Sequence, residues 1–121
     1  MKNTFLMMAV LFFSMNSFAG DIAKGKKIFK KVNCALCHNK DAMGKAKNGK
    51  VALLKGPQIA GLDEAYIVEQ VTAIQGKKRK TKNTSMMYAK IKKLTPAEIK
   101  DIAAYVHSLS KTRHVGMLQT K

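Results

Sequence analysis

Residues 34–38 read Cys34-Ala35-Leu36-Cys37-His38, and this pentapeptide decides how the chain around it must fold. Two cysteines with two residues between them can each form a thioether with one of the two vinyl groups on a porphyrin edge. A histidine directly after the second cysteine is then held where its imidazole can bind the iron. The pentapeptide therefore predicts one covalently attached haem c, bound through Cys34 and Cys37, with His38 as an axial iron ligand.

Other uses of the two cysteines require features that the sequence does not offer. A thioredoxin-like redox pair follows a strand in a βαβ setting, and no such pattern surrounds Cys34 and Cys37. A structural zinc site needs four ligands, and no second pair of cysteines or histidines follows at a suitable spacing. A disulfide between neighbours so close would join no distant parts of the chain. Haem attachment is the interpretation that uses all three side chains.

The first 19 residues have the pattern of an export signal. Lys2 provides a positive start, Phe5–Phe13 is a nearly unbroken apolar run, and small residues at 17 and 19 suit a signal peptidase. The alternative is a membrane anchor, but the apolar stretch is shorter than the roughly 20 residues that span a bilayer. We therefore expect a secretory signal peptide over residues 1–19, a haem domain over 20–121, and a location in the periplasm.

The chain is strongly basic, and this charge bears on its partners. It carries 23 Lys plus Arg against 7 Asp plus Glu, for a net charge of +16. Such a surface attracts acidic partners from a distance. Arg79 and Arg113 are the only arginines and Trp is absent, so base readers and stacking surfaces are scarce. We expect no nucleic-acid partner and, since no other long apolar run follows the signal, at most peripheral contact with a membrane.

Helical patterns occupy both ends of the domain. Asp21 can cap a helix that runs to about Val32, a second helix is predicted over Asp63–Gln75, and Gly76 ends it. Thr95-Pro96-Ala97-Glu98 is a capping box that opens a last helix. Between them, Lys77–Ser85 reads as a basic connection without periodicity. The residues predicted to face inward are Ile22, Gly25, Ile28, Phe29, Val32, Tyr66, Ile67, Val71, Ile74, Ile99, Ile102, Ala103, Val106 and Leu109. No strand signal is present, so the predicted fold class is all-α.

These features together resemble the class I c-type cytochromes, in particular the small bacterial monohaem proteins of the cytochrome c5 and c553 type. The resemblance covers nearly all of residues 20–121. It is carried by Gly25 and Phe29 before the pentapeptide, by Ile102 and Tyr105 on the last helix, and by three further groups: Gly56-Pro57-Gln58-Ile59-Ala60-Gly61, Tyr66 with Gln70, and Gly76-Lys77-Lys78-Arg79. It implies that the N- and C-terminal helices pack together around the haem. It also implies that the Pro57 carbonyl accepts the second ring N–H of His38 and so orients the imidazole.

The resemblance further implies a methionine as the second axial ligand of the iron. Members of the family place it seven residues before the leucine that precedes the last helix, and counting back from Leu94 gives Met87. Met86 is the rival, because an irregular loop can absorb one residue of slack. Met43 and Met117 are the other methionines after the signal. His107 is expected to be a helix-surface or packing residue, and His114 lies in the tail.

A histidine and a methionine on the iron would leave no position for oxygen or a substrate, and a methionine ligand raises the potential. No paired carboxylates, nucleophile with its base, or phosphate loop appears, so we expect no enzyme activity. The predicted function is a soluble periplasmic carrier of single electrons, a monomer, between a quinol-oxidising complex and a terminal oxidase or peroxidase. The alternative is a dedicated haem c subunit of a periplasmic oxidoreductase complex.

Lysines on the loops that flank the pentapeptide and the methionines offer a docking surface for acidic redox partners. The alternative is a solvated surface that only keeps the protein soluble. The lysines concerned are Lys45, Lys47, Lys50, Lys55, Lys77, Lys78, Lys80 and Lys82.

Overall fold

The computed structural model describes residues 19–44, 56–81 and 84–111. Within these ranges the chain forms helices and no strand, so the predicted all-α fold class is confirmed. The helices, in chain order, are α1 (Ile22–Val32), α2 (Ala35–His38), α3 (Glu64–Gln75), α4 (Thr84–Ile91) and α5 (Pro96–Ser108). No helix in the described ranges combines the length and apolar character needed to cross a bilayer.

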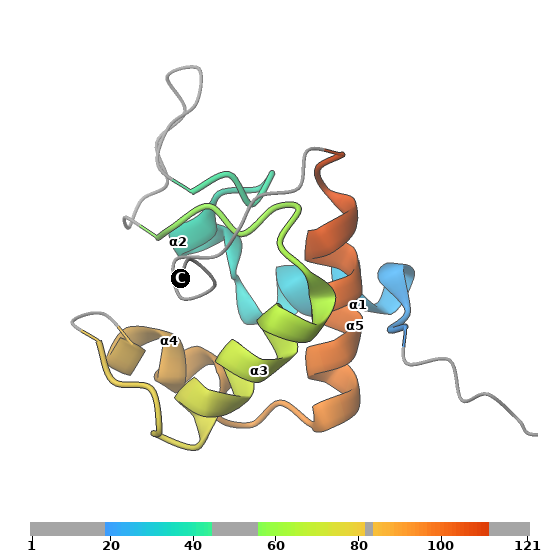
Figure 1. The fold of residues 1–121 in the computed structure, drawn as a ribbon. Helices are drawn as coiled ribbons and strands as arrows, with labels where there is room; N and C mark the ends of the chain where they lie inside the picture. The colour runs from blue at the N-terminus through green and yellow to red at the C-terminus, as the bar shows by residue number, and fades with distance from the viewer. Residues whose placement is uncertain (1–18, 45–55, 82–83, 112–121) are drawn as a thin grey trace, which may run out of the picture.

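The two terminal helices of the domain, α1 and α5, cross in close contact (Figure 1). Gly25 is buried at the crossing, where an added Cβ would lie only 1.9 Å from the Asp101 carbonyl oxygen. Only a residue without a side chain lets the two backbones approach so closely. One turn further along α1, the rings of Phe29 and Tyr105 meet edge to face with centroids 5.4 Å apart. The predicted packing of the N- and C-terminal helices is therefore confirmed.

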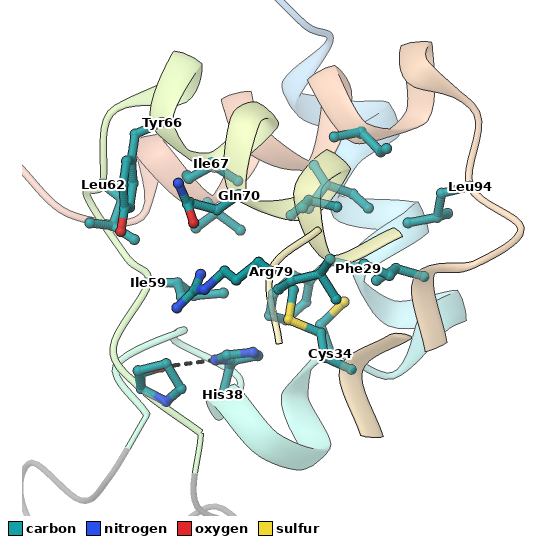
Figure 2. Close-up of a pocket in the computed structure, with 18 residues that line it drawn as sticks. Phe29, Cys34, His38, Ile59, Leu62, Tyr66, Ile67, Gln70, Arg79 and Leu94 are labelled. Carbon is teal, nitrogen blue, oxygen red and sulfur yellow. Dashed lines mark hydrogen bonds between the residues drawn. The ribbon is translucent and has the colours of Figure 1, made fainter. Parts of the chain in front are cut away.

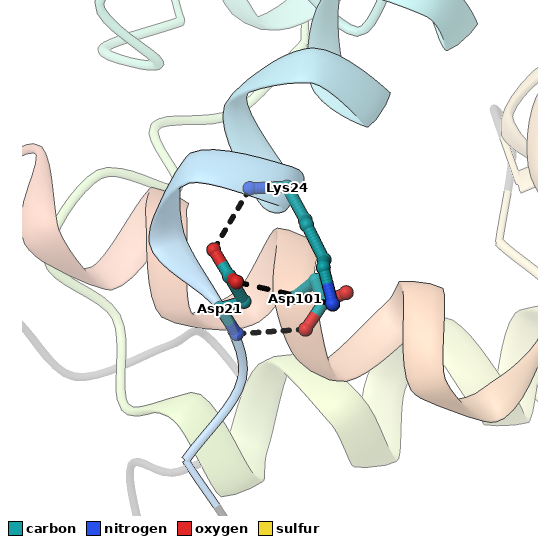
Figure 3. A network of polar contacts seen from close by, with 3 residues as sticks. All are labelled: Asp21, Lys24 and Asp101. Atoms are coloured by element: carbon teal, nitrogen blue, oxygen red, sulfur yellow. Dashed lines mark hydrogen bonds and ion pairs between the residues drawn. The ribbon is translucent and has the colours of Figure 1, made fainter.

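The start of α1 is tied to α5 by polar contacts (Figure 3). The Asp21 side chain caps α1 by accepting the Lys24 backbone N–H at 3.0 Å, and the Asp21 backbone N–H donates to Asp101 Oδ1 at 2.7 Å. The hydrogen bond from Lys24 also holds the pKa of the Asp21 carboxyl below its usual value. Because the same residue caps one helix and contacts the other, the N-terminal end of the domain is fixed against α5.

The capping box predicted at the start of α5 is present. The Glu98 backbone N–H donates to Thr95 Oγ1 at 3.2 Å, and the Thr95 backbone N–H donates to the Glu98 carboxylate at 2.8 Å. The hydrogen bond from the Thr95 backbone N–H lowers the pKa of the Glu98 carboxyl. From this start α5 runs beside both α1 and α3, and it buries Ile99, Ile102, Ala103 and Val106.

Three local expectations are corrected by the structure. The connection expected over Lys77–Ser85 ends in α4, a helix that the sequence hid because its eight residues bury only Ile91 and show no helical stripe. The turn after Asn33 is a single turn of helix, α2. Ile22, expected to face inward, is 51% exposed, because the closest approach of α1 to α5 is made one turn later, at Gly25.

Candidate haem-binding site

The interior between α1, α3, α4 and α5 is hollowed into a cavity (Figure 2). It holds about 720 Å³ of atom-free space, a figure that includes open solvent at its mouth. Its lining is mainly apolar and comes from segments far apart in the sequence. The lining residues are Phe29, Cys34, His38, Pro57, Ile59, Leu62, Tyr66, Ile67, Gln70, Val71, Ile74, Arg79, Met87, Ile91, Leu94, Ile99, Ile102 and Val106.

The two cysteines occupy different positions relative to this cavity. Cys34 lines it, whereas Cys37 is half-buried beside it and is not among the lining residues. They are not joined by a disulfide. Burial raises the pKa of the Cys34 thiol to about 11, the opposite of the lowered pKa that a thioredoxin-like nucleophile requires. The redox-pair alternative therefore fits neither the all-α surroundings nor the electrostatics of the thiol.

His38 enters the cavity from the end of α2 and is held from behind by the loop at Pro57. Its Nδ1 donates to the Pro57 carbonyl oxygen at 2.9 Å, which is the contact that the family resemblance implied (Figure 2). Burial lowers the pKa of the imidazole, so the ring is neutral at neutral pH. With Nδ1 carrying the donated proton, the lone pair of Nε2 is available for a metal ion.

Gly56 allows the Pro57 loop to come this close. Its backbone N–H donates to the Cys37 carbonyl oxygen at 2.7 Å. A Cβ at this position would lie 2.5 Å from the same oxygen and 3.0 Å from His38 Nδ1. A larger residue would therefore push the Pro57 carbonyl away from the imidazole.

The two rival methionines point to different surroundings. Met87 lines the cavity and packs against the core, whereas Met86 is 49% exposed. Both lie on α4 and not in an irregular loop, so neighbouring side chains are about 100° apart around the helix axis and cannot both face inward. Met43 packs against the core but is not one of the residues that line the cavity, and Met117 lies outside the described residues. The geometry favours Met87, and its role as iron ligand stays a prediction.

The remaining histidines have separate positions. His107 is half-buried on α5, and its Nδ1 donates to the Leu62 carbonyl oxygen at 2.7 Å. This contact holds the loop before α3 against α5, which agrees with the packing role expected from the sequence. His114 lies outside the described residues.

Arg79 is a functional candidate to which the sequence analysis assigned no role. It lines the cavity, as Gln70 and Tyr66 of α3 do (Figure 2), and its backbone N–H donates to the Ala73 carbonyl oxygen at 3.1 Å in the turn after α3. Its Nε is buried and has no hydrogen-bond partner within the described residues. A signal was available in the sequence, because an isolated arginine in a lysine-rich chain suits a buried carboxylate better than lysine does.

The arrangement fits haem c. A flat porphyrin is largely apolar and matches the apolar lining, while its two propionate carboxylates match a cationic group such as Arg79 at the wall. Arg79 is half-buried, and its buried Nε would find a hydrogen-bond partner in a carboxylate at the wall. Within the described ranges, no three His, Cys, Asp or Glu side chains come together as a metal-ion site would need. The apolar lining and the imidazole of His38 suit an iron that arrives within a porphyrin.

Comparison with known proteins agrees with this geometry. The cytochrome c family model matches residues 22–110, a range that contains the pentapeptide, Pro57, Arg79 and Met87. The chain belongs to the cytochrome c family. As a member, it carries covalently attached haem c, and it is an electron-transfer domain of the class I, all-α type. Cys34 and Cys37 have the spacing that attachment requires, and their role as the attachment residues stays a prediction.

Similar curated proteins are subunits of respiratory oxidases. The cbb3-type cytochrome c oxidase subunit FixP of Bradyrhizobium diazoefficiens is 37% identical over 89 residues, which cover 74% of this chain and 28% of that protein. FixP of Azorhizobium caulinodans is 35% identical over 86 residues, 71% of this chain and 26% of its own length. The corresponding subunit CcoP of Azospirillum brasilense is 33% identical over 103 residues, 79% of this chain and 32% of its own. The chain thus matches only about a third or less of each relative.

The chemistry of the site divides between the cofactor and the chain. Haem c supplies an iron that changes oxidation state by one electron. His38 presents a neutral Nε2, and the Pro57 carbonyl keeps the ring in one orientation. The apolar walls would exclude water, and Arg79 would supply a positive charge to balance a carboxylate at the wall.

The lysines of the expected docking surface are only partly described. Lys77, Lys78 and Lys80 are exposed on the turn after α3, close in sequence to the cavity residue Arg79. Lys77 Nζ also lies 5.0 Å from the centroid of the Tyr88 ring on α4. Lys45, Lys47, Lys50, Lys55 and Lys82 lie outside the described residues.

Proposed function

We propose that this chain is the haem c electron-transfer subunit of a periplasmic terminal-oxidase complex of the cbb3 kind. The observation that carries the proposal is its similarity to the FixP and CcoP oxidase subunits, at 33–37% identity over 71–79% of the chain in three of them. The range matched by the family model includes the cavity residues from Phe29 to Val106. Relatives of this similarity that are oxidase subunits favour an oxidase as the partner of this chain too.

The proposed axial ligands agree with this role. With His38 and Met87 both on the iron, oxygen and peroxide have no vacant position, so the domain passes electrons to a partner that performs the catalysis. His38 and Met87 both line the cavity, which supports this ligand pair. Under this proposal the chain is not itself the oxygen-reducing enzyme, and the export signal expected at residues 1–19 supports a periplasmic location.

A second candidate is a diffusible periplasmic carrier, and one observation favours it. The net charge of +16 and the exposed cations Lys77, Lys78 and Lys80 suit transient encounters with acidic partners. A stable subunit gains less from long-range attraction, because it remains bound between turnovers. The two candidates therefore differ in how long the partner is held.

The test is purification of the tagged full-length chain from its native cells, with membrane and periplasmic fractions separated. The proposal expects recovery from detergent-solubilised membranes with the oxygen-reducing subunit of an oxidase, at near-equal amounts and after a wash at high salt. Recovery of the chain alone in the periplasmic fraction would contradict it and favour the carrier. In that case the rate of electron transfer should fall steeply as the salt concentration rises. At low salt, Lys78→Glu should slow electron transfer more than Lys111→Glu does.

A further inference from the structure

One side chain, Gln75, holds the segment that carries Met87. Gln75 is the last residue of α3, and its Nε2 donates two hydrogen bonds, to the Ile91 carbonyl oxygen at 3.0 Å and to the Leu94 carbonyl oxygen at 2.8 Å. Ile91 ends α4 and Leu94 lies three residues beyond it. A single amide therefore fastens the C-terminal end of α4 and the chain that follows it to α3.

The fastened segment is part of the cavity wall. Met87, Ile91 and Leu94 all line the cavity, and Ile91 is only 4% exposed. Met87 lies one helical turn before Ile91 on the same face of α4. Whatever fixes the Ile91 and Leu94 carbonyls thereby fixes how far the Met87 side chain reaches into the cavity.

Among the described residues, few other polar contacts hold α4 in place. The helix has eight residues, fewer than the dozen or so that an isolated helix needs, so its stability comes from what it packs against. At its start, the Thr84 hydroxyl bonds to the neighbouring Thr81 backbone, at 2.9 and 3.0 Å, and to no other group in the part of the chain that the structure describes. The contact between Lys77 and Tyr88 is at an exposed lysine and contributes little.

We infer that Gln75 is a positioning residue, which keeps α4 closed over the cavity and so sets how readily Met87 leaves the iron. The inference rests on the proposed ligand role of Met87. A competing ligand can bind the axial position of the iron opposite His38 only in the fraction of molecules in which Met87 has left that position. If Gln75 stabilises the closed arrangement, its loss raises this fraction and tightens the apparent binding of the competitor.

The test is a titration of the oxidised holoprotein with imidazole, monitored by its visible spectrum and by the near-infrared band of a sulfur–iron bond. Gln75→Met keeps the length of the side chain and removes both donors. Its apparent imidazole affinity should rise about tenfold, as expected when two neutral hydrogen bonds are lost. The matched control is Asp63→Ala, because Asp63 caps the opposite end of α3 by accepting the Tyr66 backbone N–H at 2.9 Å. This control should lower stability comparably and change imidazole affinity less than threefold.

Two results would overturn the inference. One is an unchanged imidazole affinity in Gln75→Met, and the other is an equal rise in Asp63→Ala, which would trace the effect to general loss of stability.

A double variant tests whether Gln75 acts through Met87. Met87→Ala should already bind imidazole tightly, and adding Gln75→Met should change nothing further. A further tenfold rise in the double variant would mean that Gln75 acts elsewhere. If Met87→Ala keeps the near-infrared band, the proposed ligand role of Met87 fails. The band thus tests the role of Met87 independently of the imidazole titration, which tests the role of Gln75.

Discussion

The two sides of the haem cavity are built differently. On one side, His38 follows α1 almost directly, its ring is fixed by the Pro57 carbonyl, and α1 is locked to α5 through Gly25 and Asp101. On the other side, Met87 sits on the eight-residue helix α4, which is fastened mainly at its C-terminal end. The histidine is therefore held by the main packing of the domain, whereas the methionine is held by a short helix with few polar contacts to the rest of the domain.

The largest effect that this comparison predicts is on stability at the histidine side. Gly25→Ala places a methyl group where only 1.9 Å separates it from the Asp101 carbonyl oxygen, so α1 and α5 must move apart. We expect the free energy of unfolding of the holoprotein to fall by about 2 kcal/mol, in the range of overpacked cores. Denaturant unfolding followed by circular dichroism measures this change.

The matched control is Gly76→Ala, in the turn that leads towards α4. Gly76 has a φ of −78°, and an added Cβ would lie at an ordinary 3.4 Å from the Thr72 carbonyl oxygen. Alanine fits there, so stability should change by less than about 1 kcal/mol, and in the favourable direction. Equal losses at Gly25 and Gly76 would remove the contrast between the two sides.

The same contrast explains how much could be predicted from the sequence. The histidine side depends on local signals, namely the pentapeptide, the Asp21 cap and the capping box at Thr95, and each was recognised and found in place. The methionine side depends on tertiary contacts. The sequence contained no periodic signal for α4, and the Gln75 amide looks like any other polar residue at a helix end until its partners are known. Arg79 was missed for a similar reason, because only the fold brings it to the cavity wall.

A smaller effect concerns the reduction potential. Arg79→Gln removes the positive charge of a half-buried side chain from the cavity wall, and positive charge favours the reduced, less positive iron. The midpoint potential should therefore fall, by an amount on the order of tens of millivolts. Lys78→Gln removes the same charge from an exposed neighbour and should change the potential much less, because water screens it. Redox titration of both variants measures the difference, and equal shifts would place Arg79 outside the site.

The smallest effect is a dependence of stability on pH, again at the histidine side. The pKa values of Asp21 and Glu98 are lowered in the folded protein by the backbone hydrogen bonds of the α1 and α5 caps. Their stabilising contribution is therefore complete above the unfolded pKa values of about 4, and it is lost as the pH falls through the lower folded values. The free energy of unfolding should differ less between pH 6 and pH 3 in the double variant Asp21→Asn, Glu98→Gln than in the native sequence. An undiminished divergence would mean that the caps do not contribute to it.

The most direct test of the whole account is the near-infrared spectrum of the oxidised protein, because the sulfur–iron bond gives a weak band there. The native protein should show this band, Met86→Ala should keep it, and Met87→Ala should lose it, since Met87 lines the cavity and Met86 is half exposed. A band that survives in Met87→Ala and disappears in Met86→Ala would contradict the proposed ligand pair and the division of the site into its two sides.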